Sequence, residues 1–300
     1  MTSAAADLRH MARALELAAR GLLTTDPNPR VGCVIADRER VLAEGWHERA
    51  GGPHAEAMAL ASLRGSARGA TAYVTLEPCC HFGRTPPCAD ALVAAGVRRV
   101  VYAVRDPNPR VDGGGARRLA AAGVEVAGGL MEREARALNP GFLSRFERAR
   151  PWVRVLLAAP RDGAGEAAVQ RLRARASAVL TGSGTVLADD PRFAVDPAGA
   201  PRQPLRIVLD SRLRIPPQAR IVPPPGELLV LTASDDAGRR AALERAGARV
   251  LRMPAGSGGL DLAAVLRVLA ELEVNELQVE AGATLTAAFL DAGLADERVS

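Results

Sequence analysis

The sequence predicts an α/β protein with two domains. Segments rich in branched apolar residues alternate with alanine-rich amphipathic segments, which is the order of strands and helices around largely parallel sheets. The length of 300 residues is twice the ~150 residues of a typical domain. Between residues 145 and 151 a charged helical segment ends and Pro151 opens a new apolar strand. We therefore place one domain at 1–147 and a second at 148–300.

The first domain begins with an amphipathic helix at 7–20, because its apolar residues recur every three or four positions. Two strands joined by a charged turn follow at 31–36 and 41–44. Pro53 is typical of a helix start, and Gly96 and Gly123 are typical of helix ends. These signals predict further strands at 70–76, 97–104 and 124–127 and helices at 54–63, 88–95 and 115–122.

The second domain repeats the alternation. A charged helical segment at 132–150, which Asn-Pro-Gly at 139–141 interrupts, runs up to the boundary between the domains, and the first strand of the second domain is expected at 152–159. Further strands are expected at 178–181, 205–210, 228–232, 250–253 and 276–280, and helices at 169–176, 237–246, 260–272 and 284–292. The alternation again predicts an open sheet with helices on its faces.

Composition excludes several classes of protein. A hydrophobic fraction of 48% with 24% charged residues excludes wholesale disorder. No window approaches the roughly eighteen uninterrupted apolar residues of a transmembrane helix. Charged residues are spread through the first helical segment, unlike a secretory signal peptide. We therefore expect a cytoplasmic protein without a membrane partner.

The charges exclude further functions. The net charge is +5, with no basic block and only two Trp and two Tyr residues, which argues against a nucleic-acid surface. All 39 basic residues are arginine, so a lysine Schiff base, a Walker A lysine and a pyridoxal-phosphate lysine are excluded. A small phosphorylated substrate remains compatible with this charge.

One group of residues has the composition of a catalytic zinc site. His54 and Glu56 stand at the start of a predicted helix, Cys79 follows a strand, and Cys88 starts another helix. One imidazole and two thiolates suit zinc and leave a fourth position open. Glu56 is then placed to move protons rather than to bind metal. A His-x-Glu element with a downstream Pro-Cys is typical of zinc-dependent base deaminases.

The second thiolate does not stand at its usual position, because the Pro-Cys-x-x-Cys element is absent and position 82 is Phe82. Cys80 and Cys88 are the candidates, and adjacent cysteines rarely face one metal, so we choose Cys88. A purely structural zinc would need a fourth protein ligand, which His81 would supply. Cys33 lies in an apolar strand and is expected in the core.

Four segments of the first domain, 28–35, 45–60, 73–92 and 106–115, resemble the deaminase domain of the bifunctional riboflavin-biosynthesis deaminase/reductase family. The resemblance implies a cytidine-deaminase-like fold and the substrate 2,5-diamino-6-(5-phosphoribosylamino)pyrimidin-4-one. It also implies zinc held by His54, Cys79 and Cys88, with Glu56 as the catalytic acid and base. The residues that it implies for substrate binding are Asn28, His81 and Arg84.

Three segments of the second domain, 178–193, 205–216 and 279–297, are similar to the reductase domain of that family. The similarity implies a dihydrofolate-reductase-like fold that reduces a ribosyl group with NADPH. Arg173 and Glu280 would contact the substrate. The residues implied to contact NADPH are Thr185, Asp189, Gly282, Ala283 and Thr284.

The second half also departs from the family. Leu156 stands near the position of a family lysine, Pro160 replaces a serine, and a loop that contains a tryptophan is missing from 156–170. The chain stops at Ser300, where the family continues into further strands. We therefore expect an incomplete reductase domain, with a deaminase whose second half is a scaffold or homo-oligomer surface as the alternative. A nucleic-acid base deaminase is a more distant alternative.

Overall fold

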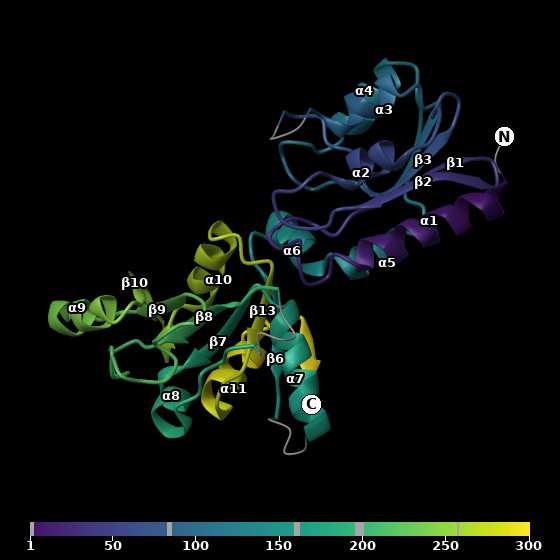
Figure 1. The fold of residues 1–300 in the computed structure, drawn as a ribbon. Helices are drawn as coiled ribbons and strands as arrows, with labels where there is room; N and C mark the ends of the chain where they lie inside the picture. Colours follow the sequence, from purple (N-terminus) through teal and green to yellow (C-terminus); the bar gives the residue numbers. More distant parts are fainter. Residues whose placement is uncertain (1–2, 83–85, 159–162, 196–200, 257) are drawn as a thin grey trace. The chain divides into compact units, whose positions relative to one another are not determined.

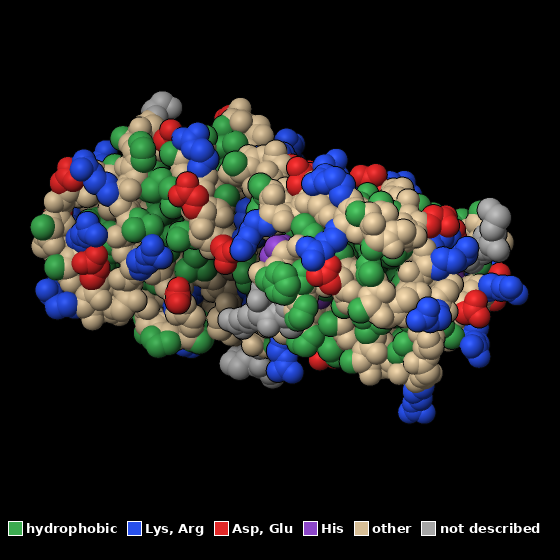
Figure 2. Space-filling model, turned by 90° about the horizontal axis from the view of Figure 1, so that it is seen from above, with side chains coloured by type: hydrophobic (Ala, Val, Ile, Leu, Met, Phe, Trp, Pro, Cys, Tyr) green, Lys and Arg blue, Asp and Glu red, His purple; other side chains and the backbone are tan. Residues whose placement is uncertain are grey.

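The computed structural model describes residues 3–82, 86–158, 163–195, 201–256 and 258–300. It divides the chain into two compact units, Met1–Glu147 and Arg148–Ser300, and each is described by itself. Among the described residues, no helix has both the length and the apolar character needed to cross a membrane. On the face drawn in Figure 2, arginine side chains are scattered among acidic and apolar ones.

The first unit contains a five-stranded sheet in the order β2-β1-β3-β4-β5. β1 pairs antiparallel with both β2 and β3, whereas β3, β4 and β5 are parallel. The parallel half brings the ends of β3 and β4 to one edge of the sheet, where loops carry functional residues. The strands are β1 (Gly32–Asp37), β2 (Arg40–Trp46), β3 (Thr71–Leu76), β4 (Arg99–Val104) and β5 (Glu125–Gly128).

Helices cover both faces of this sheet (Figure 1). On one face, Met11 of α1 and Phe142 of α6 pack in a cluster with Tyr73. On the other face, Ala59 of α2 and Leu119 of α4 pack in a cluster that includes the buried Cys33, so the prediction that Cys33 lies in the core is confirmed. The helices are α1 (Ala4–Ala19), α2 (Ala55–Ser62), α3 (Cys88–Ala94), α4 (Gly114–Ala121), α5 (Glu132–Leu138) and α6 (Pro140–Arg148).

The second unit contains a seven-stranded sheet in the order β10-β9-β8-β7-β13-β6-β14. Every neighbouring pair in it is parallel. The chain winds outward from β7 through β8 and β9 to β10, while β13 returns between β6 and β7, so the winding direction changes there. The strands are β6 (Trp152–Leu156), β7 (Ala178–Gly182), β8 (Leu205–Leu209), β9 (Leu228–Thr232), β10 (Arg249–Arg252), β13 (Glu276–Val279) and β14 (Glu297–Val299).

Two cores flank the second sheet. Leu266 of α10 and Phe289 of α11 pack on one face, and Val186 of α8 and Leu243 of α9 pack on the other. A short hairpin of β11 (Ala255–Gly256) and β12 (Gly259–Leu260) precedes α10. The helices are α7 (Gly163–Arg175), α8 (Ser183–Asp189), α9 (Ala237–Arg245), α10 (Leu262–Glu271) and α11 (Ala283–Asp291).

The predicted α/β class with largely parallel sheets is confirmed in both units. The sequence reading missed α8, the β11–β12 hairpin and β14, all of them short. It also started α7 six positions late, at 169 instead of Gly163. Glycines at the starts of α7 and α8 have low helix propensity, so the apolar pattern appears only in the later turns.

Candidate active site

Helix α2 positions two of the predicted catalytic residues. His54 is its N-cap residue, and its carbonyl accepts the amide N–H of Met58 at 3.0 Å. Glu56 lies in the first turn. The helix approaches β2 so closely that a Cβ built at Gly45 would lie 2.3 Å from the backbone nitrogen of Ala59. Only glycine permits this contact, which fixes His54 and Glu56 at the end of the sheet.

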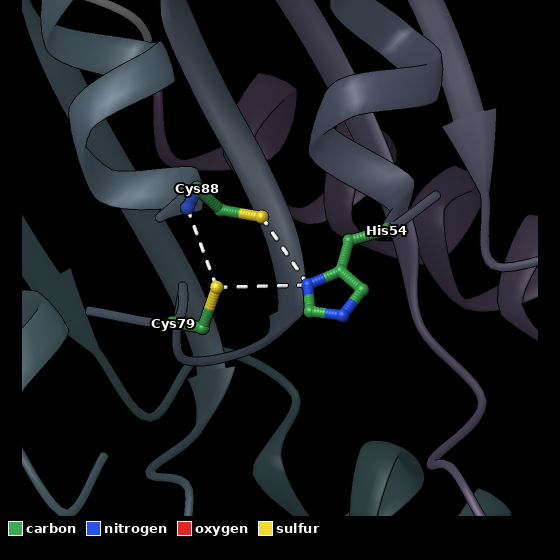
Figure 3. Close-up of side chains that lie close together, drawn as sticks. All are labelled: His54, Cys79 and Cys88. Atoms are coloured by element: carbon green, nitrogen blue, oxygen red, sulfur yellow. Dashed lines mark hydrogen bonds between the residues drawn. The ribbon is translucent and has the colours of Figure 1, made fainter. Parts of the chain in front are cut away.

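Three potential metal ligands meet at this end of the sheet (Figure 3). His54 Nδ1 lies 3.6 Å from Cys79 Sγ and 3.4 Å from Cys88 Sγ. The amide N–H at the start of α3, that of Cys88, donates to Cys79 Sγ at 3.3 Å. The ligand atoms all lie within 4.8 Å of one another. Cys88 is buried while His54 and Cys79 are partly exposed, so the cluster borders solvent on one side.

The donor set suits zinc. One imidazole nitrogen and two sulfurs are preferred zinc ligands, and three protein ligands leave the open position of a catalytic site. Among the described residues, neither Cys80 nor His81 belongs to this group. The thiol of Cys80 instead lies 3.6 Å from the carbonyl oxygen of Arg110.

Hydrogen bonding favours the thiolate of Cys79, which is the form of this side chain that binds a metal. Hydrogen bonds from the Cys88 side chain, His54 and the Cys88 amide lower the pKa of Cys79 to about 4, against the opposing effect of burial. The bond to Cys79 is also the main reason that the pKa of His54 is raised. Cysteines beside a cation and a helix N-terminus have such lowered pKa values.

Glu56 is a buried carboxyl beside the cluster. It is 3% exposed, and burial raises its pKa to about 7. Its electrostatic interactions with His54, Cys79 and Cys88 place the carboxyl next to the potential ligands. A carboxyl with this pKa exchanges protons readily near neutral pH.

Glu77 is a second buried carboxylate at the site, and the sequence reading missed it. It follows β3, two residues before Cys79. Its Oε2 accepts the N–H groups of Asp106 at 3.3 Å and Gly113 at 3.0 Å, and its Oε1 accepts that of Ala116 at 3.0 Å. One side chain thereby ties the segment after β4 and the N-terminus of α4 to the loop that carries Cys79.

The backbones of these two loops are in direct contact. A Cβ built at Gly115 would lie 1.8 Å from the carbonyl oxygen of Pro78. Gly115 therefore has to be glycine for α4 to start here. The run Gly113-Gly114-Gly115 was the available sequence signal for this close approach.

Two further polar residues beside the cluster were not predicted. Asp106 is buried, and burial is the main reason that its pKa rises to about 7, with Glu77 and Cys79 adding to the effect. The His47 ring lies edge-on to His54 with 5.7 Å between centroids, and its Nδ1 is 2.9 Å from the carbonyl oxygen of Pro53. Burial lowers the pKa of His47. Both residues lie in segments that resemble the family, which was the available signal.

The residues predicted to bind the substrate have different surroundings. Asn28 Oδ1 accepts the N–H of Gly51 at 3.3 Å, which attaches Asn28 to the loop leading to His54. His81 is partly buried, and its Nδ1 has no hydrogen-bond partner among the described residues. Arg84 lies outside the described residues.

The second unit holds a pocket of about 1050 Å³ at the C-terminal ends of β7, β8 and β13. Ligand sites in parallel sheets lie at this edge, where the winding direction changes. The predicted cofactor residues that line the pocket are Thr185, Gly282, Ala283 and Thr284. Asp189 is exposed at the end of α8 and is not part of the described pocket wall.

The N-terminus of α11 suits a phosphate group in this pocket. Its N-cap residue, Gly282, makes no side-chain cap, so the first backbone N–H groups of the helix have no side-chain acceptor. The N–H of Gly282 itself donates to Thr185 Oγ1 at 3.2 Å and joins α8 to α11. An uncapped helix N-terminus with small residues is a favourable phosphate site.

The two predicted substrate residues of the second unit pair with each other. Arg173 donates from Nε and Nη2 to the Glu280 carboxylate at 2.7 and 2.6 Å. The guanidinium carbon also lies 5.2 Å from the ring centroid of Phe193. The pair joins the last turns of α7 to the residue that follows β13.

Two family models match the chain. The model of the cytidine and deoxycytidylate deaminase zinc-binding region matches residues 4–104. The model of the RibD C-terminal domain matches residues 151–299. The first match contains all three potential zinc ligands, and the second contains the pocket.

Similar proteins extend over both units. The riboflavin biosynthesis protein RibD of Escherichia coli is 46% identical over 98% of this chain and 86% of its own length. The structure of Acinetobacter baumannii RibD is similar with a TM-score of 0.89 and 42% identity, covering 98% of this chain and 85% of that one. The structure of a diaminohydroxyphosphoribosylaminopyrimidine deaminase/5-amino-6-(5-phosphoribosylamino)uracil reductase from Thermotoga maritima is also similar. Its TM-score is 0.83 and its identity 34%, and the match covers 97% of this chain and 85% of that one.

Proposed function

The chain belongs to the RibD family of riboflavin-biosynthesis proteins, and from this membership we propose the substrate and the residues that act on it. The family joins a zinc-binding deaminase domain to an NADPH-dependent reductase domain, and the chain contains both. The proposed substrate of the first unit is 2,5-diamino-6-(5-phosphoribosylamino)pyrimidin-4-one. Its zinc would be held by His54, Cys79 and Cys88.

The first unit would carry out hydrolytic deamination. Zinc, when bound, supplies a Lewis acid that activates water as a nucleophile. Glu56 would take a proton from the attacking water on its carboxylate and pass it to the amino group, which leaves as ammonia. Water thereby replaces the amino group on the ring carbon with a carbonyl oxygen. Asn28, His81 and Arg84 are the proposed contacts of the rest of the substrate.

The second unit would reduce the ribosyl group of the deaminated product. Its pocket would hold NADPH, with the phosphates at the α11 N-terminus beside Gly282, Ala283 and Thr284 and with Thr185 on α8. Asp189 stays a proposed NADPH contact on the strength of the resemblance alone. Arg173 and Glu280 are the proposed contacts of the substrate.

The observation that carries the deaminase proposal is the convergence of His54, Cys79 and Cys88 with a buried glutamate beside them. The test is a coupled assay on the purified chain. Zinc-loaded protein should release one ammonia per pyrimidine phosphate, and zinc-free protein should release none. Ammonia release that does not depend on zinc would contradict the proposal.

The same assay measures the second unit through the loss of NADPH absorbance after deamination. The shortened segment at 156–170 predicts reduction that is slower than deamination, because hydride transfer depends strongly on the placement of the reacting groups. Reduction that keeps pace with deamination would contradict this expectation. A homo-oligomer and a cytoplasmic location stay predictions.

A further inference from the structure

Asn139 breaks the charged helical segment between α5 and α6, and its contacts explain the break. It is the C-cap residue of α5, with φ −124° and ψ 40°, which lie outside the helical region. Asparagine is mostly exposed in folded proteins, yet this one is only 4% exposed. The break in the helix lets its side chain bond to a segment 109 residues earlier in the chain.

The amide of Asn139 bonds to the backbone of Arg30 in both directions. Its Oδ1 accepts the N–H of Arg30 at 2.8 Å, and its Nδ2 donates to the carbonyl oxygen of the same residue at 2.9 Å. A primary amide offers donors and an acceptor side by side, as a neighbouring β-strand does, so it satisfies both backbone groups of Arg30. The Arg30 guanidinium also donates to the carbonyl oxygens of Leu138 at 2.7 Å and Leu22 at 3.3 Å. These bonds fix Arg30 against α5 and against the turn after α1.

Arg30 belongs to the loop between α1 and β1, at the end of the first sheet where the potential zinc ligands meet. β1 starts at Gly32, and the N–H of Gly32 donates to Thr75 Oγ1 at 3.1 Å near the C-terminal end of β3. The loop that follows β3 carries Cys79. Asn28, the proposed substrate contact, lies two positions before Arg30. The anchored residue and the substrate contact are therefore close neighbours at the active-site end of the sheet.

We propose that Asn139 is a positioning residue for deamination, because it holds this loop in the place where Asn28 meets the substrate. This inference rests on the proposed function, in which Asn28 contacts the substrate. Pro27 and Pro29 flank Asn28, and a proline fixes its own φ and restricts the residue before it. The segment is therefore stiff, and a shift of Arg30 moves Asn28 with it.

Removing the Asn139 amide should displace Asn28 without removing zinc. Asn139→Ala deletes both bonds to the Arg30 backbone, and a misplacement of about 1 Å costs up to roughly a hundredfold in rate. We expect kcat/KM for deamination to fall roughly ten- to a hundredfold and the zinc content to stay that of the wild type. Tyr73→Phe is the matched control, because it deletes another hydrogen bond inside the first unit, from the Tyr73 hydroxyl to Asp7 at 2.6 Å. It should lower the midpoint temperature of unfolding and leave kcat/KM close to the wild-type value.

The test is a double-mutant cycle in kcat/KM between Asn28→Ala and Asn139→Ala, measured on the zinc-loaded full chain. If Asn139 acts through Asn28, the double variant should lose little more than Asn28→Ala alone, because the contact that Asn139 positions is already gone. A purely structural role would make the two losses multiply. Losses that multiply, a wild-type kcat/KM in Asn139→Ala, or loss of zinc from that variant would overturn the role.

A second variant covers the case in which Asn139→Ala fails to fold. Asn139→Asp keeps the acceptor for the Arg30 N–H and lacks the donor to the Arg30 carbonyl oxygen, and it then takes the place of Asn139→Ala in the cycle. If the wild-type chain releases no ammonia, the proposed function fails and the inference fails with it. If the wild-type chain is active and the losses multiply, only the inference fails.

Discussion

Replacing Glu77 by glutamine should weaken the contact between the metal-binding loop and the N-terminus of α4. The carboxylate accepts three backbone N–H groups, two on Oε2 and one on Oε1. A glutamine that turns its oxygen toward Asp106 and Gly113 must turn its amide N–H₂ toward the N–H of Ala116. One hydrogen bond is lost and two donors face each other, which costs about 1–3 kcal/mol.

This cost predicts both a thermal and a kinetic effect. For a domain of about 150 residues, each kcal/mol of lost stability lowers the midpoint temperature of unfolding by roughly 2–4 °C. Glu77→Gln should therefore lower the midpoint temperature of the first unit by about 3–10 °C. Asp106 is attached to Glu77 and lies beside the zinc cluster, so kcat/KM for deamination should also fall. Differential scanning calorimetry and an ammonia-release assay measure the two effects.

Glu125→Gln is the matched control, because Glu125 is exposed on the edge strand β5 and pairs only with Arg99 among the described residues. Exposed ion pairs contribute little, so its transition should shift by less than about 2 °C. The reasoning fails if Glu77→Gln melts and deaminates like Glu125→Gln.

Three further changes have expected outcomes. Glu56→Gln should keep zinc and fold but lose about 10²–10⁴ in the rate of deamination, and a rate above about a tenth of wild type would exclude a proton-transfer role. Arg206 is buried and donates to the carbonyl oxygens of Ile221, Pro223 and Gly226. Arg206→Met should therefore lower the free energy of unfolding of the second unit by about 2–5 kcal/mol, measured by urea unfolding. An unchanged free energy of unfolding would contradict this. Burial opposes ionisation of Asp296, but hydrogen bonds from Arg150, the Val153 amide and Arg148 outweigh it and hold the pKa of Asp296 below its usual value. The ionised form therefore stabilises the fold above the unfolded-state pKa of about 3.9, and this contribution is lost as the pH falls through the lowered folded-state pKa. Asp296→Asn should thus be less stable than wild type at pH 7, with the difference shrinking below pH of about 4; a difference that does not depend on pH would rule out this assignment.

The sequence alone led to the fold class and the family, and both are confirmed. Long elements with a clear period, such as α1 and β3, were placed to within three residues. The three-residue β14 was missed because its pairing with β6 is a tertiary contact across the whole second unit. So few residues carry no period that a sequence pattern can reveal.

The candidate site also contains some residues that the sequence predicted and others that it did not. His54, Cys79 and Cys88 were predicted because imidazole and thiolate side chains are the ligands that zinc prefers, and the structure brings these three side chains together. Glu77 and Asp106 were missed because their positions follow from backbone hydrogen bonds between segments 29 or more residues apart. Such a contact has no local signature beyond the glycines that permit it.

The most direct test of the zinc centre is the metal content of two cysteine variants that differ by one atom from the wild type. Cys88→Ser should lose zinc and deamination, because serine is a poor zinc ligand. Cys80→Ser should keep one zinc per chain and most of its deamination, because the Cys80 thiol contacts the Arg110 carbonyl and not the cluster. If Cys80→Ser loses zinc and Cys88→Ser retains it, the assignment of the ligands is wrong, and with it the proposed catalytic centre.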